Sequence, residues 1–273
     1  MPTLALVFAL AAAGFHALWN LLLARAPDVQ AATAVALVTA QLAFAPVAAI
    51  VWRADAGVWP WLVGSGLLEL AYFGLLAAAY TRAPLSVVYP VARGGAPVLV
   101  LAISVLVLGH STNAWQVAGV LTIVAGVLLV RGFHGASGEG LAFGVAIAAC
   151  IAGYTLIDSR GIRHAGPVTY LELSMAVPSL VFASAVVRSR GRAAVLAAVG
   201  PATVVAGLAT FVAYAFVLAA LARASAASVA AVRETSVVVA TALAAAVLGE
   251  RVGAVRLAGA VAVVAGVALL AHD

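Results

Sequence analysis

The sequence predicts an all-α polytopic membrane protein, with about ten transmembrane helices arranged as two inverted five-helix repeats. The observations behind this prediction are the composition, a series of long apolar runs, and a weak internal repeat. Of the 273 residues, 66% are hydrophobic and only 8% are charged, whereas soluble domains are about half apolar and about a quarter charged. So few charges cannot cover a water-facing surface, and lipid is therefore the expected solvent.

The apolar runs are long enough to cross a bilayer, whose hydrocarbon core of about 30 Å needs about 20 helical residues. Because the runs are continuously apolar, they favour helices over membrane strands, which alternate with a period of two. The first run is too long for the apolar region of a signal peptide, so we count it as a span. The expected spans lie at about 3–24, 31–52, 58–80, 84–108, 115–131, 140–158, 168–187, 199–220, 225–248 and 255–271.

Short polar clusters separate the runs, for example at Arg25–Asp28 and Arg53–Asp55. Because the links are short, neighbouring helices are expected to be antiparallel. A glycine-rich link precedes the sixth run. We therefore expect one five-helix repeat over 1–131 and a second over 138–273.

The chain also repeats itself weakly, between segments 80–130 and 221–270. Gly109, Gly119, Gly126 and Arg93 of the first half recur at a constant offset as Gly249, Gly259, Gly266 and Arg233 of the second. Each copy ends a half of five spans, and an odd number of spans forces the two halves into opposite orientations. Inverted repeats of this kind are typical of transporters. The paired glycines, seven residues apart on one helix face, are expected to be packing residues that let helices approach closely.

Several short motifs resemble a known family. They are His16-Ala17-Leu18-Trp19-Asn20, Pro84 to Arg93, Leu108-Gly109-His110 before Trp115 to Gly119, and Leu248-Gly249-Glu250-Arg251 before Leu257-Ala258-Gly259. Over the whole chain the sequence resembles EamA-type members of the drug/metabolite transporter superfamily. The resemblance implies ten spans in two inverted repeats, a central cavity, and movement of small metabolites, often outward. His110 departs from the usual glutamate of the first junction, which the second junction keeps as Glu250.

Five charged residues lie at least four residues from either end of a predicted span: Glu69, Arg93, Glu172, Arg233 and Glu234. Each costs about 2.5–3.5 kcal/mol at the bilayer centre, so they must pair, neutralise or face a hydrated cavity. Arg93 is either a fork for a substrate carboxylate or phosphate, or a structural partner of Glu69 or Glu234. Glu69 is either a proton carrier, since burial disfavours a charged carboxyl, or a permanently paired acid. Glu172, near a span end, needs no special role.

Polar and aromatic side chains share faces of several spans. His16 and Asn20 lie four residues apart beside Trp19, and Tyr154 and Asp158 repeat this spacing on the equivalent span of the second half. Aromatic walls with a few polar groups are typical of a small-molecule pocket, although anchoring at the membrane interface is the alternative for each ring. The predicted substrate-binding set is His16, Trp19, Asn20, Glu69, Tyr72, Tyr89, Arg93, Tyr154, Tyr214, Arg233 and Glu234.

These features predict a transporter that exports a small organic metabolite, such as an amino acid or a related compound. Its two halves would alternate access to a central site, driven by a proton gradient or by exchange. The alternatives are an accessory or structural membrane subunit and an intramembrane enzyme. The G-x-S-G string at 135–138 lies in a link and no H-E-x-x-H occurs, so we expect no enzyme. Cys150 stands alone, and we expect neither a metal nor a cofactor.

The expected partners are the substrate and membrane lipids. All side chains counted as Lys or Arg are arginines scattered among the links, which suits anionic head groups rather than nucleic acid. The sequence leaves open whether the protein forms a homodimer. The expected location is a bacterial inner or plasma membrane, which the chain crosses many times. The orientation stays open. The links expected on the same side of the membrane as the termini carry fewer arginines than the links on the other side. Because arginines in short links favour the cytoplasm, this favours termini outside, whereas the resemblance implies termini inside.

Overall fold

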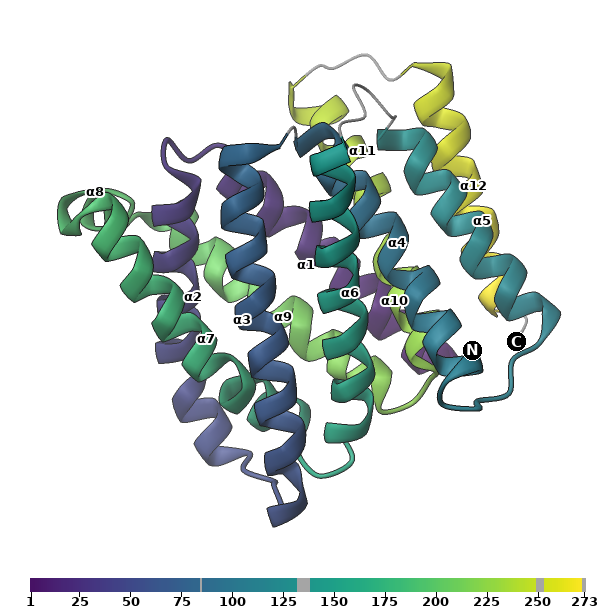
Figure 1. The fold of residues 1–273 in the computed structure, drawn as a ribbon, viewed down its shortest axis with the longest axis horizontal. Coiled ribbons are helices and arrows are strands. Elements are labelled where there is room, and N and C mark those ends of the chain that lie inside the picture. The colour runs from purple at the N-terminus through teal and green to yellow at the C-terminus, as the bar shows by residue number, and fades with distance from the viewer. Residues whose placement is uncertain (84, 132–137, 249–252, 272–273) are drawn as a thin grey trace.

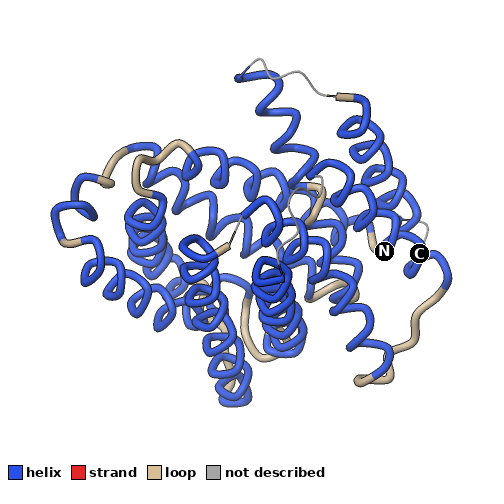
Figure 2. The backbone as a smooth tube through the Cα atoms, turned by 45° about the horizontal axis from the view of Figure 1, so that its top comes forward, coloured by secondary structure: helices blue, strands red, loops and turns tan. Residues whose placement is uncertain are grey.

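The structure, a computed structural model, describes residues 1–83, 85–131, 138–248 and 253–271. Pro84, the string at 135–137 and the junction residues Gly249, Glu250 and Arg251 lie outside this range. The described chain is helical, with one isolated bridge between Ala54 and Ala165 (Figures 1 and 2). Its helices are α1 (Thr3–Ala24), α2 (Val29–Ile50), η1 (Ala56–Val58), α3 (Trp59–Arg82), α4 (Leu85–Leu106), α5 (Ala114–Arg131), α6 (Gly138–Gly161), α7 (Pro167–Arg190), α8 (Arg192–Ala197), α9 (Pro201–Leu221), α10 (Ala226–Arg233), α11 (Ser236–Leu248) and α12 (Ala254–Ala271).

The predicted all-α membrane architecture is confirmed. Eight of the described helices are long and apolar enough to cross a bilayer, and α5 is a shorter apolar helix. The helices begin where the sequence provides start signals. Asp28 accepts from the backbone N–H groups of Gln30 and Ala31 at the start of α2, and Pro167 and Pro201 open α7 and α9.

The ninth span differs from the prediction, because it is two helices rather than one. A turn at Glu234 and Thr235 separates α10 from α11. At this turn the N–H groups of Glu234 and Thr235 bond to the carbonyls three residues earlier, at 3.0 Å each. This 3₁₀-type tightening often marks a functional position in a helix. A second difference is the short helix α8, which forms in the arginine-containing link before α9.

The repeat glycines pack the last helices of the two halves against each other. A Cβ added at Gly126 would lie 2.6 Å from the Gly259 carbonyl oxygen, and one added at Gly266 would lie 2.8 Å from that of Gly119. The predicted packing role of these glycines is therefore confirmed. Because early α5 meets late α12, the two helices run antiparallel, side by side at one edge of the bundle (Figure 1).

The opposite edge is formed by α2 and α7, the second helices of the two halves (Figure 1). Arg190 at the end of α7 donates to Gln30 Oε1 at 3.2 Å, near the start of α2. Gln41, farther along α2, donates to the carbonyl of Glu172 in the first turns of α7 at 3.2 Å. Equivalent helices are thus antiparallel at both edges, which is the relation that an inverted repeat requires.

Between these edges lie two groups of helices. One group, called here the α1–α9 group, contains α1, α9, α10 and α11; the other, the α3–α6 group, contains α3, α4 and α6. Each group combines helices of both halves. The end of the bundle that holds Met1 and Ala271 is called here the terminal end, and the Met1 amino group donates to the Leu270 carbonyl there at 2.9 Å. The other end, with the α1–α2 link, is called the α1–α2 end.

Candidate functional site

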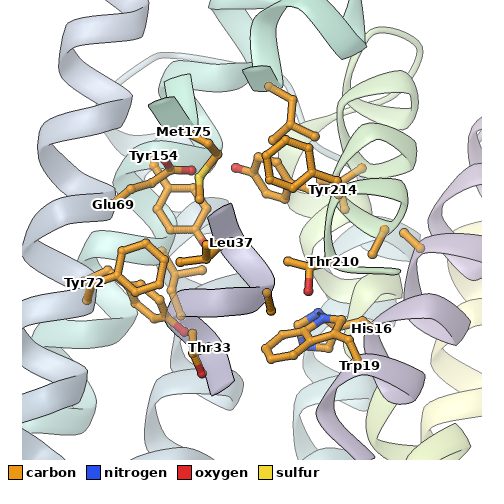
Figure 3. A pocket seen from close by; sticks show the side chains of 18 of the residues that line it. His16, Trp19, Thr33, Leu37, Glu69, Tyr72, Tyr154, Met175, Thr210 and Tyr214 are labelled. Atoms are coloured by element: carbon orange, nitrogen blue, oxygen red, sulfur yellow. Dashed lines mark hydrogen bonds between the residues drawn. The ribbon is translucent and has the colours of Figure 1, made fainter. Parts of the chain in front are cut away.

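A cavity lies between the two helix groups, near the middle of their helices. Its deep part has a volume of about 130 Å³, and an outer part of about 340 Å³ extends to Ala24, Val29 and Gln30 at the α1–α2 end. Figure 3 shows Glu69, Tyr72 and Tyr154 on one side of the space, facing His16, Trp19, Thr210 and Tyr214 on the other. The cavity is thus lined by both groups, and so by both halves of the chain.

The structure brings ten of the eleven predicted substrate-binding residues to this cavity. The deep part is lined by Glu69, Tyr154, Tyr214 and Arg233; the outer part by Asn20 and Tyr89; and both parts by His16, Trp19, Tyr72 and Arg93. The structure differs from the prediction at Glu234, which does not line the cavity. Glu234 is 1% exposed and lies behind the wall, because it is drawn to Arg93.

Arg93 is held by three side chains of the opposite helix group. Its Nε lies 3.0 Å from Glu234 Oε2, an ion pair at an angle poor for a hydrogen bond. Its Nη2 lies 2.9 Å from His16 Nε2 and donates to Ser236 Oγ at 3.3 Å. The alternative of a structural ion pair is therefore the one observed, with Glu234 and not Glu69 as the partner. This network ties α4 to α1 and to the turn between α10 and α11.

His16 connects this network to the aromatic wall. Trp19 Nε1 lies 3.2 Å from His16 Nδ1, on the other side of the imidazole from Arg93. A neutral histidine accepts a hydrogen bond at only one ring nitrogen. A neutral His16 can therefore accept fully from Arg93 or from Trp19, but not from both at once.

Arg233 and Glu69 are the charged groups of the deep cavity that lack such partners. Arg233 is 4% exposed, and its Nε and Nη2 atoms have no hydrogen-bond partner among the described residues. Glu69 is 5% exposed, and within the same part of the chain its Oε2 is also without a partner. Unmatched buried polar atoms are rare in native proteins and call for an explanation such as a ligand, an ion or water.

Asp158 is an acid whose position the sequence analysis left out of the site. It is fully buried, and it accepts hydrogen bonds from Tyr170 at 2.9 Å and from Tyr214. The Tyr170 hydroxyl oxygen also lies 3.4 Å from the Trp61 carbonyl oxygen. Asp158 therefore joins α6 and α7 to α9, on the terminal-end side of the cavity. The signal that could have found it was its spacing of four from Tyr154, which places both on one helix face.

Thr33 and Thr210 also line the deep cavity and were missed, because a single threonine in an apolar helix carries no distinguishing pattern. Thr210 Oγ1 donates to the Ala206 carbonyl at 2.8 Å, and Thr33 Oγ1 to the Val29 carbonyl at 2.7 Å. Each hydroxyl keeps lone pairs that can accept from a ligand. Glu172, by contrast, is half-buried on α7 and does not line the cavity.

The terminal end contains a further polar cluster. Gln116, near the start of α5, donates to Ser225 at 2.5 Å and to Ser228 at 3.1 Å. Ser225 also caps α10 by accepting from the Ser228 N–H. These bonds hold the start of the interrupted helix against the last helix of the first half.

Comparison with known proteins agrees with this architecture. A crystal structure described only as that of a protein has a TM-score of 0.78 with this chain at 17% identity, over 98% of this chain and 95% of the other. This likeness shows a shared fold. The comparison with curated proteins yields no match. The EamA-like transporter family matches the sequence twice, over residues 3–132 and 138–271, so that nearly the whole chain is covered. The chain belongs to the EamA-like transporter family and is an integral, multi-pass membrane transporter.

Proposed function

We propose that the protein moves a small anionic or zwitterionic organic metabolite, such as an amino acid or a related compound, by alternating access. One observation carries this proposal: the central cavity contains an arginine and a glutamate whose buried polar atoms lack partners. Charged groups inside a membrane protein are costly and generally mark substrate or ion pathways. A solute with complementary charges would satisfy both groups at once.

Alternating access is supported by the way the two helix groups meet. The cavity reaches the α1–α2 end, whereas the Asp158–Tyr214 hydrogen bond joins the two groups on the terminal-end side. In an inverted repeat the two halves can exchange conformations, which closes one end and opens the other. Rocking of the α1–α9 group against the α3–α6 group would therefore break the contact at Asp158 and narrow the outer cavity.

Glu69 is our candidate for energy coupling. A carboxyl with an unmatched buried oxygen is a place where a proton can be held while the cavity is closed. Transport would then be driven by a proton gradient, or by exchange when a second substrate molecule takes the proton's place. The proposed direction, export, rests on the family resemblance of the motifs.

The test is counterflow in proteoliposomes. Vesicles preloaded with one unlabelled solute, from a panel of amino acids, nucleobases, sugars and organic cations, are given a trace of the labelled solute outside. We expect protein-dependent accumulation for a carboxylate-bearing solute. Glu69→Gln should remove acceleration by an imposed pH gradient and leave exchange measurable, because the amide keeps the shape but cannot carry a proton.

The matched control is Glu172→Gln, which removes a half-buried acid outside the cavity lining. It should transport as the wild type does. The proposal is wrong if folded, inserted Glu69→Gln protein responds to the pH gradient as the wild type does, and if Arg233→Ala protein also transports normally. An accessory subunit would show no counterflow with any solute.

A further inference from the structure

Arg93 and Arg233 occupy equivalent positions in the two halves, but their guanidinium groups have different surroundings. Nε and Nη2 lie along one edge of the planar guanidinium, and this edge is the fork that binds a carboxylate with two parallel hydrogen bonds. In Arg93 the Nη2 atom meets His16 and Ser236, while Nε makes no hydrogen bond but is paired in charge with Glu234, whose Oε2 lies 3.0 Å away. In Arg233 the same two nitrogens are buried without partners.

The sequence explains this asymmetry. At the repeat offset, Glu234 corresponds to Gly94 and Ser236 corresponds to Ala96. Two of the three partners of Arg93 are thus replaced, in the other half, by residues that have no polar side chain. A Cβ added at Gly94 would lie 3.1 Å from Leu128 Cδ2, so α5 fills the space beside that position. The first half therefore supplies nothing equivalent to Glu234 for Arg233.

The location of Arg233 points to a ligand. Its side chain is 4% exposed and lines the deep cavity, so the unfilled edge is neither on the surface nor inside a sealed core. Arg233 is also the last residue of α10, where the turn at Glu234 interrupts the helix. Substrate sites at interrupted helices in the middle of the membrane are typical of inverted-repeat transporters.

We propose that Arg233 is the carboxylate-binding residue of the transport site and that Arg93 is a structural residue, held by its internal ion pair and by the contacts of its Nη2 atom. The inference rests on the proposed function and narrows its substrate to a solute with a planar carboxylate. Glu69, on the opposite wall of the deep cavity, would face the remainder of the solute. Sequence symmetry alone would have given the two arginines the same role.

The first test compares thermal stability without any ligand. Arg93→Gln should lower the melting temperature of the purified protein by several degrees, because it leaves the buried Glu234 carboxylate without its cation. Arg233→Gln should lower the melting temperature less, because no hydrogen bond or ion pair of the fork is lost and only the longer-range attraction to Asp158 is removed. The inference is overturned if Arg233→Gln destabilises the protein as much as Arg93→Gln does.

The second test measures binding, as the shift in melting temperature with a fixed set of probes. The probes are the proteinogenic amino acids, lactate and pyruvate, each beside its carboxamide, with nucleobases, sugars and organic cations. We expect at least one carboxylate to raise the melting temperature, while its carboxamide does not. Arg233→Gln should weaken that binding at least tenfold, and Arg233→Lys should restore only part of it, since an ammonium keeps the charge but loses the fork.

Arg223→Gln is the matched control. It removes the same charge from an exposed arginine, whose Nη1 donates to the Ala219 carbonyl, and it should bind the carboxylate as the wild type does. A carboxylate shift that survives in Arg233→Gln, or a shift with non-carboxylate solutes alone, would overturn the inference. With either result, counterflow of any solute would leave the transporter proposal standing. If the wild type shows neither binding nor counterflow with any solute, the inference and the transporter proposal are both rejected.

Discussion

At the scale of single residues, the site depends on which buried polar groups have partners. Arg93 is held by Glu234, whereas Arg233 and Glu69 keep unmatched atoms at the cavity wall. Unmatched buried groups cost stability, because each has lost its water without gaining a protein partner. Their presence in an otherwise apolar bundle is therefore expected to serve binding. Asp158 belongs to the opposite class, since both of its oxygens accept from tyrosine hydroxyls.

Removing one of these hydroxyls should destabilise the observed conformation. Tyr214→Phe leaves Asp158 Oδ2 buried without its donor, at a cost of about 1–3 kcal/mol. Asp158→Asn alone should also lower the melting temperature. The double variant should lose less stability than the sum of the losses of the two single variants, because both substitutions remove the same contact. A thermal double-mutant cycle measures this, and strictly additive losses would show that the hydrogen bond contributes nothing.

Much of the site's residue content, though not its pairing, could be predicted from the sequence. His16, Trp19 and Asn20 lie on one face of their helix, and this spacing in the sequence was sufficient to predict that they line the cavity. The partner of Arg93 was not decidable, because choosing between Glu69 and Glu234 requires the relative positions of α3, α4 and α10. Asp158 was noted on one helix face with Tyr154 but left out of the predicted set; the predicted span ended at 158, whereas α6 continues to Gly161 and the acid is buried.

At the scale of helices, the bundle depends on close packing through small residues. In lipid there is no hydrophobic force between helices, so the α5–α12 contact is stabilised by dispersion between closely spaced backbones. Gly126 and Gly259 each lie against the other's carbonyl oxygen, with no room for a methyl group. The glycine spacing predicted this contact from sequence. The turn between α10 and α11 could not be predicted, since Ser225 to Leu248 contains no proline or glycine to mark it.

Gly126→Ala should therefore destabilise the bundle. The added Cβ would lie 2.6 Å from the Gly259 oxygen, and overpacking of this kind costs about 1–3 kcal/mol. Gly14→Ala is the matched control, because Gly14 lies within α1 and an added Cβ there meets no atom within 4 Å. It should leave the melting temperature unchanged or raise it, since alanine favours a helix over glycine. Equal effects of the two substitutions would contradict the packing role of the α5–α12 contact.

At the scale of the whole molecule, the two halves are distributed over both helix groups. Each group takes helices from both repeats, and the edge pairs α2–α7 and α5–α12 join equivalent helices (Figure 1). In the proposed mechanism, the groups tilt about the central cavity while the edges stay packed. The structure has its cavity extended to the α1–α2 end and its contacts at Asp158 intact. The account therefore requires a second conformation, in which the terminal end is open.

The most direct test of this claim is a pair of distance distributions between spin labels, measured by double electron–electron resonance on the protein in nanodiscs. In a Cys150→Ala background, one pair replaces the exposed Arg25 and Arg82 at the α1–α2 end, and the other replaces the exposed Arg163 and Arg223 at the terminal end. Adding Tyr214→Phe removes the Tyr214–Asp158 bond, which joins the groups on the terminal-end side, so the terminal pair should gain a longer distance while the α1–α2 pair gains a shorter one. Distributions that stay unchanged, or that both lengthen, would contradict alternating access around this cavity.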